Sequence, residues 1–529
     1  MARALRLLRA SAGLVVHPTR LRRWRAHLSR AWHQPGGGGS ARPARTPGPR
    51  PREVRVLVHA DERLVALLRP EWRQVTWDGA AVPPDVELVV LGWPLPGTAG
   101  DADAIATAAA RSGRPLLVWD TADPGAPTCP VADRAGLVRV AVPERVSDYD
   151  HPDVAVLSPG VQPREHNPVR TGRRVPLARL GGADPVFEEA GDLGPEARRD
   201  RAHDVVVQRG TTARPDRVLE LLAEGTVVMT SDPALAQTAA AVQVVDRETA
   251  PLALAALARH PELRRRAALA GVREALARHS TTAAVDEVLA ATGVAARRRA
   301  RPVTAIVPTM RPGQIDHVLA TLARQRHEQV QLVLITHGFE ADPGTADRAR
   351  EAGLADVRLL PADADLTLGA LMNLGVEAAD GEYVAKMDDD NHYGPHYLGD
   401  LLATFDFSGA HVAGKWAHLT HLRSTGATFL RFPEAENTYT RLVQGGTMVM
   451  PRAVAAELRF EDVPRRVDTT FLEKVAAAGG RVYSADRYNF VSVRGASVDG
   501  HTWKISDTEL LAKPSSDLFY GEPWAHADV

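Results

Sequence analysis

The chain has 529 residues, too many for one ordinary hydrophobic core, so we expect two or three domains. Hydrophobic residues make up 44% and charged residues 24%, the balance of a soluble globular protein, and the net charge of −1 excludes the basic signature of a nucleic-acid-binding protein. The single cysteine, Cys129, excludes an intrachain disulfide and a cysteine-built metal cluster, no apolar run is long enough to span a bilayer, and a reducing, cytoplasmic location is expected.

Residues 1–52 contain many arginines and no acidic residue. Leu21, Trp24, Leu28 and Trp32 fall on one face of a predicted helix, with arginines around them. A basic helix with tryptophans can lie on an anionic membrane surface, which would bring the protein to the inner face of the cell membrane. The alternative is a disordered leader. The glycine- and proline-rich residues after the helix predict a flexible linker.

From residue 53 to residue 296, predicted strands alternate with predicted helices. This alternation is typical of parallel sheets with crossover helices. The first α/β unit has predicted strands 54–59, 86–91 and 116–119 and a predicted helix 102–112. A second α/β unit follows, with predicted strands 204–208 and 227–230 and predicted helices 215–223, 252–259 and 262–278.

Three segments of this region, 118–124, 157–168 and 214–226, resemble spore-maturation-type glycosyltransferases. The resemblance implies a GT-B-like α/β domain over residues 53–296, in which Glu220 bonds a nucleotide ribose; by itself Glu220 reads as a surface helix residue. The stretch from Gly182 to His203 is shorter than this family's. We therefore expect a degenerate or acceptor-positioning domain rather than a second active transferase.

A third unit is predicted over residues 302–515, followed by a C-terminal tail at 516–529. Its predicted strands 303–307, 331–336 and 383–387 alternate with helices that end near 324 and 379. The last strand runs directly into Asp388, Asp389 and Asp390. Adjacent carboxylates repel one another, so a fold keeps them together only where positive charge lies among them, and a divalent cation is the natural candidate. The alternative is a solvated acidic turn.

Five segments in this unit resemble a family-2 glycosyltransferase of GT-A fold, in the order in which that family carries them. They are 303–309, 368–381, 386–390, 444–452 and 467–472. The resemblance implies that the acidic triplet is the family's Asp-x-Asp motif. It also implies a nucleotide-sugar donor and a Mn²⁺ or Mg²⁺ ion that neutralises the leaving diphosphate.

The resemblance assigns the donor site to residues on several elements. Pro308 and Thr309 line the nucleotide pocket, and Asn373 belongs to the helix before the metal strand. His337 stands where the family has an acidic pair that contacts the nucleotide base. The family's phosphate-reading arginine is absent before Asn373, and Arg311 is the expected substitute.

The metal site is expected at the triplet itself. Asp388 would face the ribose or the metal, and Asp390 would ligate the metal, while Asp389 either contacts the nucleotide or only separates the two. His501 stands where some GT-A enzymes supply a metal or phosphate ligand; the alternative is a surface histidine. His392 either extends the metal shell or caps the turn.

A general base must take the proton of the attacking acceptor hydroxyl. The resemblance implies Asp468 in this role, with Glu461 and Asp462 as rivals. The alternative for Asp468 is an N-cap of the helix that follows it.

The expected fold is α/β, with two tandem Rossmann-like domains: a GT-B-like half followed by a GT-A nucleotide-diphospho-sugar transferase fold. The expected function is a metal-dependent, inverting hexosyltransferase-type enzyme that acts on a bacterial cell-envelope glycan or a lipid-linked acceptor. The arginine-rich, lysine-poor composition indicates a bacterial genome rich in GC, and the missing Gln-x-x-Arg-Trp signature disfavours a processive polymerase. The alternatives are a non-catalytic glycan- or partner-binding scaffold and a nucleotidyltransferase, which would need a better glycine-rich phosphate loop after the first strand.

Overall fold

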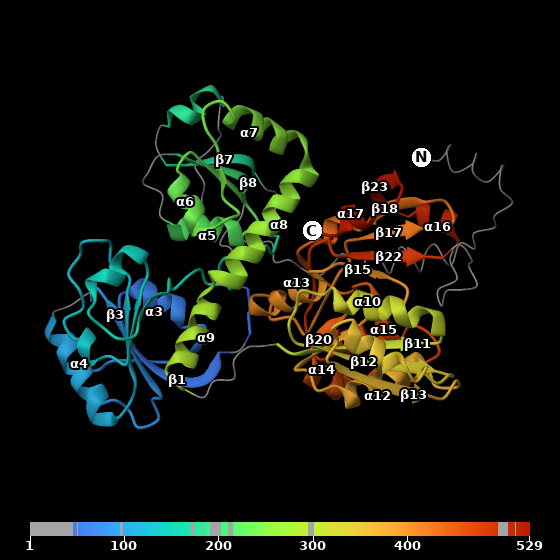
Figure 1. Ribbon diagram of the computed structural model, residues 1–529, viewed down its shortest axis with the longest axis horizontal. Coiled ribbons are helices and arrows are strands. Elements are labelled where there is room, and N and C mark those ends of the chain that lie inside the picture. Colours follow the sequence, from blue (N-terminus) through green and yellow to red (C-terminus); the bar gives the residue numbers. More distant parts are fainter. Residues whose placement is uncertain are drawn as a thin grey trace.

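The computed structural model describes residues 46–49, 51–95, 99–170, 175–181, 184–190, 203–209, 215–294, 301–495, 506–513 and 515–529. The predicted basic helix around residues 21–32 and His501 lie outside these ranges. Within them the chain builds four sheets covered by helices, so an α/β fold is confirmed (Figure 1). No helix in this part of the chain is both long and apolar enough to cross a membrane.

The first sheet has six parallel strands in the order β2-β1-β3-β4-β5-β6. Apolar residues of helices cover both of its faces, which is why β4 is buried along its whole length. The strands are β1 (Arg52–His59), β2 (Trp72–Thr76), β3 (Leu88–Trp93), β4 (Leu116–Asp120), β5 (Leu137–Val140) and β6 (Val154–Val156), and the helices are α3 (Glu62–Leu68) and α4 (Ala99–Ser112).

The second sheet has four parallel strands in the order β10-β9-β8-β7. The region predicted as one domain over 53–296, with a second α/β unit from residue 204, thus contains two sheets. Its last helix returns to the first sheet, where Val285 and Leu289 join the same buried cluster as Val54. The elements are β7 (Val175–Gly181), β8 (His203–Arg209), β9 (Val227–Thr230), β10 (Gln243–Val244), α5 (Pro215–Ala223), α6 (Pro233–Thr238), α7 (Ala250–Arg259), α8 (Pro261–Arg278) and α9 (Thr281–Ala291).

The third sheet has eight strands in the order β13-β12-β11-β14-β20-β16-β21-β19. Strands β13, β12, β11 and β14 are parallel, and β20 is antiparallel to both of its neighbours. The strands are β11 (Val303–Thr309), β12 (Val330–His337), β13 (Asp356–Ala362), β14 (Tyr383–Lys386), β16 (Val412–Gly414), β19 (Thr438–Thr440), β20 (Val449–Pro451) and β21 (Val482–Ser484); the helices are α10 (Ile315–Ala323), α11 (Thr345–Glu351), α12 (Leu368–Ala378), α13 (Tyr397–Ala403), α14 (Arg452–Leu458) and α15 (Val467–Ala477).

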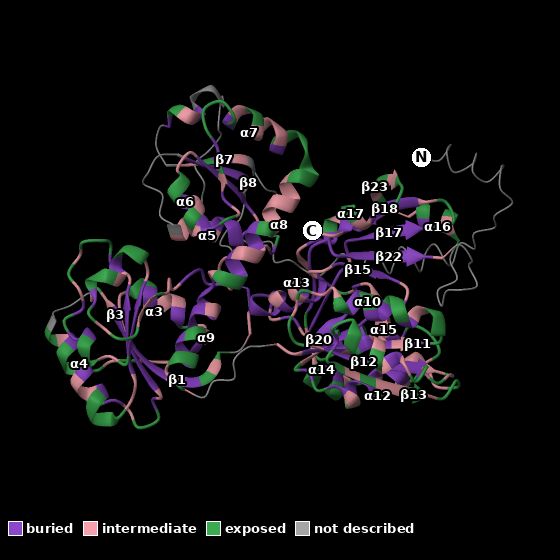
Figure 2. Cartoon of the chain, in the orientation of Figure 1, coloured by how far each residue is buried: buried purple, intermediate pink, exposed green. Residues whose placement is uncertain are grey.

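A fourth, five-stranded sheet in the order β15-β22-β17-β18-β23 lies beside the third. The segment predicted as a C-terminal tail supplies its edge strand and a short helix. Buried residues line the strands of all four sheets, and exposed residues lie on the outer faces of the helices (Figure 2). The elements are β15 (His392–Tyr393), β17 (His418–Leu422), β18 (Ala427–Arg431), β22 (Phe490–Arg494), β23 (Ser515–Tyr520), α16 (Asp507–Leu511) and α17 (Trp524–Ala527).

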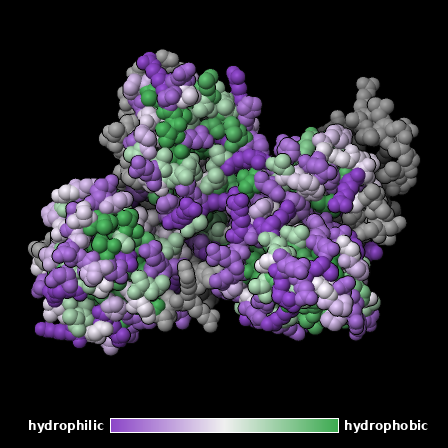
Figure 3. All heavy atoms as spheres, viewed as in Figure 1, coloured by the Kyte–Doolittle hydropathy of each residue, from purple (hydrophilic) through white to green (hydrophobic). Residues whose placement is uncertain are grey.

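Helix α8 joins the second sheet to the third-sheet unit. Arg273 on α8 makes a two-pronged ion pair with Asp400 on α13, with Nε and Nη2 each 2.7 Å from a carboxylate oxygen. One cluster of buried apolar residues contains both Leu276 of α8 and Phe407 of the third-sheet unit. Hydrophilic side chains gather where the units meet (Figure 3). The seam therefore combines a continuous apolar contact with ion pairs.

Replacing Arg273 with Met should destabilise the chain. The buried Asp400 carboxylate would lose its partner, which costs about 3 kcal/mol when one member of a buried pair is removed. The measurement is calorimetric unfolding of the full chain. Arg350→Met is the matched control, because Arg350 and Asp347 form an exposed pair and its loss should cost less than about 0.5 kcal/mol. Equal effects of the two substitutions would show that the pair does not hold the seam.

Candidate active site

The site lies at the carboxyl ends of two neighbouring strands. β11 pairs with β14 in parallel, with Ile306 opposite Lys386, so both strands end at the same edge of the third sheet. β11 ends at Thr309, and the acidic triplet of 388–390 follows β14 after Met387. Ligands in open α/β sheets bind beyond the carboxyl ends of the strands, so this edge is where a donor would be expected.

Asp389, the middle carboxylate of the triplet, is buried and ties the two strand ends together. It accepts hydrogen bonds from the Thr309 hydroxyl and from Arg311 Nε, the latter at 3.1 Å. The Arg311 backbone N–H donates to the Thr309 hydroxyl at 3.0 Å, which completes a closed turn. Every described contact of Asp389 is therefore inside the protein, as expected for a residue that positions its neighbours.

Asp388 and Asp390 remain partly open, unlike Asp389, with side chains 34% and 23% exposed. Asp388 accepts from Lys386 Nζ at 2.8 Å and from Asn391 Nδ2 at 3.2 Å. Asp390 Oδ2 lies 2.9 Å from Arg311 Nη2. Two oxygen-bearing groups are thus presented to solvent from one turn, which is the arrangement a bound cation or a polar ligand needs.

Asp468 reaches the same site from α15. Lys386 is almost completely buried, and its ammonium lies 2.8 Å from Asp388 and 3.5 Å from Asp468 Oδ1. The Asp468 side chain is 32% exposed. The N-cap position of α15 is Arg466, with no side-chain hydrogen bond to the helix, so the alternative in which Asp468 caps this helix is wrong.

A double-glycine turn lets the two carboxylates approach. A Cβ atom on Gly445 would overlap the Asp468 carboxylate, and one on Gly446 would overlap that of Asp388. Tyr393 connects this turn to the triplet, because its hydroxyl donates to the Gly446 carbonyl at 2.8 Å and accepts the Asp388 backbone N–H at 2.7 Å. The turn therefore forms one wall of the site.

Charge is only partly balanced within the site. The acidic triplet and Asp468 bring four carboxylates together, and Lys386 and Arg311 supply two cations. Burial raises the pKa of Asp390, Asp388 raises it further and Arg311 opposes the shift. Burial also raises the pKa of Asp468, where Lys386 opposes the shift and Asp388 adds to it. Arg494, a third and buried cation, also interacts with Asp390. The four carboxylates still outnumber these three cations, which favours a further positive group.

A divalent cation fits this donor set. No group of three or more His, Cys, Asp or Glu side chains that could hold a metal occurs within the described ranges. Asp388 and Asp390 offer two partly open carboxylates, and Mg²⁺-type ions are commonly held by one or two carboxylates together with substrate phosphates. The predicted third ligand, His501, lies outside the described residues, so its role stays a prediction.

Two predicted donor residues make structural contacts. Asn373 Nδ2 donates to the Phe460 carbonyl at 3.0 Å, and its Oδ1 accepts the Phe460 N–H at 2.9 Å. Both ends of the amide are thus used on backbone. His337 lies at the end of β12, beside the end of β11, and its Nε2 is 3.1 Å from the Ala364 carbonyl. Contact of either residue with a nucleotide stays a prediction.

The structure distinguishes between the alternatives predicted for His392 and for the general base. His392 is buried, lies 2.7 Å from Asp528, stacks on Trp524 and has Arg324 Nη2 3.1 Å from its Nδ1, so its described side-chain contacts are not to the triplet. The two rival bases have partners away from Lys386: Glu461 lies 3.6 Å from Lys474, and Asp462 accepts from Thr367 at 2.6 Å. Only Asp468 among the three shares a cation with the triplet.

Lys386 and Tyr393 connect the site, and neither was assigned a role from the sequence. A lysine within an otherwise apolar strand next to three aspartates is a usable signal for Lys386, because a buried ammonium requires an anionic partner. Nothing in the sequence pattern distinguishes Tyr393. Its function depends on Gly446, which is distant in sequence and adjacent only in the fold.

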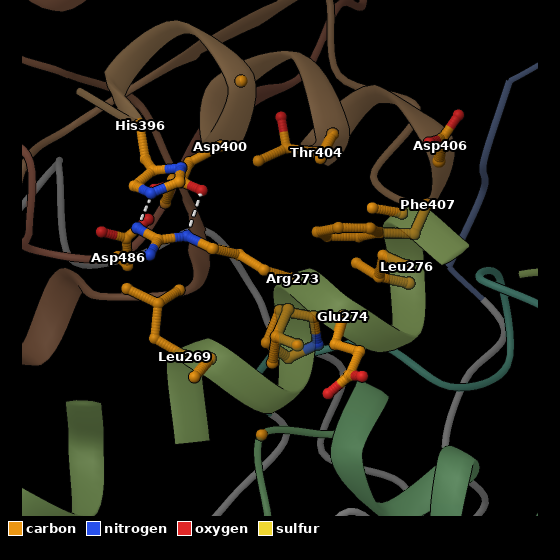
Figure 4. Close-up of a pocket in the computed structure, with 18 of the residues that line it drawn as sticks. Leu269, Arg273, Glu274, Leu276, His396, Asp400, Thr404, Asp406, Phe407 and Asp486 are labelled. Carbon is orange, nitrogen blue, oxygen red and sulfur yellow. Dashed lines mark hydrogen bonds and ion pairs between the residues drawn. The ribbon is translucent and has the colours of Figure 1, made fainter. Parts of the chain in front are cut away.

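A separate cavity of about 1060 Å³ lies at the seam between α8 and the third-sheet unit (Figure 4). Arg273 points at Asp400 at one end, and Leu276 and Phe407 face each other at the other. Burial keeps Asp400's pKa above its usual range, although the Arg273 hydrogen bond opposes the shift. The two charged residues named here, Arg273 and Asp400, form an ion pair that joins α8 to the third-sheet unit.

Gly445→Ala and Gly446→Ala should each abolish most activity without unfolding the chain. The new Cβ would push a carboxylate out of place, and a displacement of about 1 Å at a reacting group costs on the order of 100-fold in rate. Turnover of a nucleotide sugar is the measurement. Gly136→Ala is the matched control, because a Cβ there meets only the Leu116 carbonyl at an ordinary 3.7 Å. Full activity in both site variants would exclude this turn as a wall of the site.

Comparison with known proteins identifies the family of this region. Residues 304–421 match the model of Glycosyl transferase family 2. The predicted family-2 domain is therefore confirmed for these residues, and the chain contains a glycosyltransferase domain. The matched segment includes Thr309, Arg311 and the acidic triplet, and it ends before Gly445 and Asp468. No curated protein matches the chain.

Solved glycosyltransferase structures are similar to part of the chain. One is a mannosyltransferase from Pyrobaculum calidifontis in complex with GDP-Man and Mn²⁺, at 16% identity and a TM-score of 0.28, with 36% of this chain and 56% of that chain covered. Another is TarS from S. aureus in complex with UDP-GlcNAc, at 17% identity and a TM-score of 0.30, with 37% and 59% covered. The match thus spans less than two thirds of either protein.

Proposed function

We propose that this chain, which contains a family-2 glycosyltransferase domain, is a metal-dependent, inverting enzyme. It would move a sugar from a nucleotide-sugar donor to a hydroxyl group of a cell-envelope glycan or a lipid-linked acceptor. The observation that carries this proposal is the ion pairing of buried Lys386 with both Asp388 and Asp468. Lys386 thus pairs with both Asp388, the proposed donor-side carboxylate, and Asp468, the proposed base.

The donor side rests on the acidic triplet. Asp388 and Asp390 would hold the divalent cation, and the ion when bound supplies positive charge to the leaving diphosphate. Asp389 and Thr309 hold Arg311 at the mouth of the site, where its guanidinium also pairs with Asp390. Nε and Nη2 of that guanidinium are used by Asp389 and Asp390, so the proposed contact with a phosphate oxygen would be made by Nη1.

The acceptor side rests on Asp468. In a single displacement, the acceptor oxygen bonds to the anomeric carbon, the bond from that carbon to the diphosphate oxygen breaks, and Asp468 takes the hydroxyl proton. Lys386 holds Asp468 in place and opposes the effect of burial on its pKa, so the carboxylate stays available as a base. Inversion follows because attack and departure occur on opposite faces of the sugar.

The first two sheets are proposed to position the acceptor rather than to bind a second donor. The carboxylate of Glu220, the predicted ribose contact, is occupied on both sides: Oε2 lies 2.9 Å from Arg217 and Oε1 lies 3.8 Å from His166. A ribose hydroxyl would have to displace these partners. This supports the degenerate or acceptor-positioning alternative.

Asp390→Ala should weaken Mn²⁺-dependent donor binding on the order of 100-fold, because an ion that contributes several kcal/mol loses one of its two proposed protein ligands. Calorimetric titration with UDP- and GDP-sugars, with Mn²⁺ and with EDTA, is the measurement. Asp347→Asn, an exposed carboxylate on α11, is the control and should bind as the wild type does. No donor binding by the wild type, or binding unaffected by Asp390→Ala, would favour the scaffold alternative.

Asp468→Asn should lower kcat by about 100- to 10,000-fold, the usual contribution of a general base, and leave donor affinity near the wild-type value. Asn keeps the shape of the side chain and can still accept a hydrogen bond from Lys386. Glu461→Gln and Asp462→Asn should retain most activity because their partners lie away from Lys386. A larger loss in either of these two variants would transfer the role of base to that residue.

A further inference from the structure

Trp416 lies on the loop directly after β16, beside the double-glycine turn. The backbone N–H of Lys415 donates to the Thr447 hydroxyl at 2.9 Å, and the Lys415 carbonyl accepts the Gln444 N–H at 3.0 Å. These two bonds bracket Gly445 and Gly446, the residues that touch the site carboxylates. The position of Trp416 is therefore fixed relative to the proposed base and the donor carboxylate.

One face of the Trp416 indole ring packs against Phe432. It stacks on Phe432 with ring centroids 4.3 Å apart and only 4° between the planes. The Trp416 backbone is held by a hydrogen bond from its N–H to the Ser484 hydroxyl at 2.9 Å. The Arg431 guanidinium lies 4.7 Å from the Phe432 ring centroid. Rigid aromatic support of this kind is typical of a surface that a ligand contacts.

Phe432 holds this stack at a conformational cost. Its backbone lies in the left-handed region, at φ 49° and ψ 50°, which disfavours a residue with a bulky side chain. Residues held in this region cost on the order of 1–3 kcal/mol and cluster at functional sites. The Phe432 ring is buried, whereas Trp416 is only half-buried. The strained residue thus serves as the inner layer and the tryptophan as the outer layer.

The polar edge of Trp416 is also available. The described residues include no acceptor for its indole N–H, and the nitrogen is not sealed inside the protein. Trp93 and Trp119, by contrast, each donate to a backbone carbonyl, at 2.7 and 2.9 Å. A half-open indole with a spare donor follows directly after Lys415, whose backbone bonds to the turn that touches Asp388 and Asp468. This combination of an aromatic ring and nearby polar groups matches the composition of a carbohydrate subsite.

We propose that Trp416, backed by Phe432, is the acceptor subsite and that it stacks against a pyranose ring. A pyranose has one face of C–H groups and a rim of hydroxyls, so the face would lie on the indole while the rim meets the indole N–H and Asp468. This inference rests on the proposed function and narrows it: the acceptor is a glycan with a terminal sugar ring, not a ring-free polyol or a bare lipid hydroxyl.

Kinetics provide the first test. Trp416→Ala should raise the acceptor KM about 10-fold with methyl hexopyranosides as probes, the effect expected for one aromatic stacking contact. Hydrolysis of the nucleotide sugar without acceptor should not change. Trp416→Phe should retain part of the affinity. Trp77→Ala, a half-buried tryptophan of the first-sheet unit, is the matched control and should leave both rates unchanged. An unchanged acceptor KM in Trp416→Ala would overturn the subsite.

Binding provides a second test that does not depend on catalysis. The full chain labelled with 5-fluorotryptophan carries nine tryptophans, and the Trp416 fluorine signal is the one lost in Trp416→Phe. Methyl hexopyranosides of gluco, galacto and manno configuration should shift that signal, and ribitol, which has no ring, should not. No shift, an equal shift with ribitol, or equal shifts of all tryptophans would overturn the proposal.

The two tests separate this inference from the function it rests on. A selective shift of the Trp416 signal by pyranosides, in a protein that neither binds nor hydrolyses any donor, would support the sugar subsite and reject the transferase. If the wild type hydrolyses the donor normally and Trp416→Ala leaves the acceptor KM unchanged, the transferase function is supported and the Trp416 subsite is rejected.

Discussion

The candidate active site depends on two buried or half-buried cations that hold four carboxylates together. Lys386 pairs with Asp388 and Asp468, and Arg311 pairs with Asp389 and Asp390. Without them the carboxylates would repel one another across the ends of β11, β14 and α15. Because the cations come from the strand ends themselves, the site is assembled by the fold before any ligand binds. The remaining excess of negative charge is what a divalent cation would balance.

Hydrogen bonds also connect the site to residues further from the triplet. Tyr393 and the Gly445–Gly446 turn join the triplet to the far half of the third sheet, and the Lys415 backbone joins that turn to Trp416. Asp388, Asp468 and the Trp416 ring are thereby attached to one hydrogen-bonded frame. Precise positioning of this kind is what group-transfer catalysis requires, since small displacements at a reacting centre cost large factors in rate.

The first two sheets are joined to the third-sheet unit by packing contacts and ion pairs as well as by the chain. Helix α8 carries Arg273 to Asp400 and Leu276 to the apolar cluster of the third-sheet unit, and α9 returns the chain to the first sheet. A polar seam with a cavity and a shared apolar cluster join the second-sheet unit to the third-sheet unit. This arrangement suits a role in presenting an acceptor to the site.

The sequence by itself determined the α/β class, most strand and helix positions and the family-2 domain. Helix 215–223 and strand 227–230 match the prediction residue for residue, because their hydrophobic patterns and the glycine stop at Gly225 are local signals. A second α/β unit beginning at residue 204 was also predicted, whereas the order of the strands within each sheet was not, since local alternation does not say which strands pair.

Only the tertiary structure decided which candidates meet. It placed Asp468, rather than Glu461 or Asp462, beside Lys386, turned the Asn373 amide onto the Phe460 backbone, and showed that Asp389 faces inward to Arg311 and Thr309. Trp416 and Phe432 are separated in sequence and stack only because β16 and β18 end near each other. The physical reason is common to all of these cases: a charge or a ring acts through its neighbours in space, and chain order records only its neighbours in sequence.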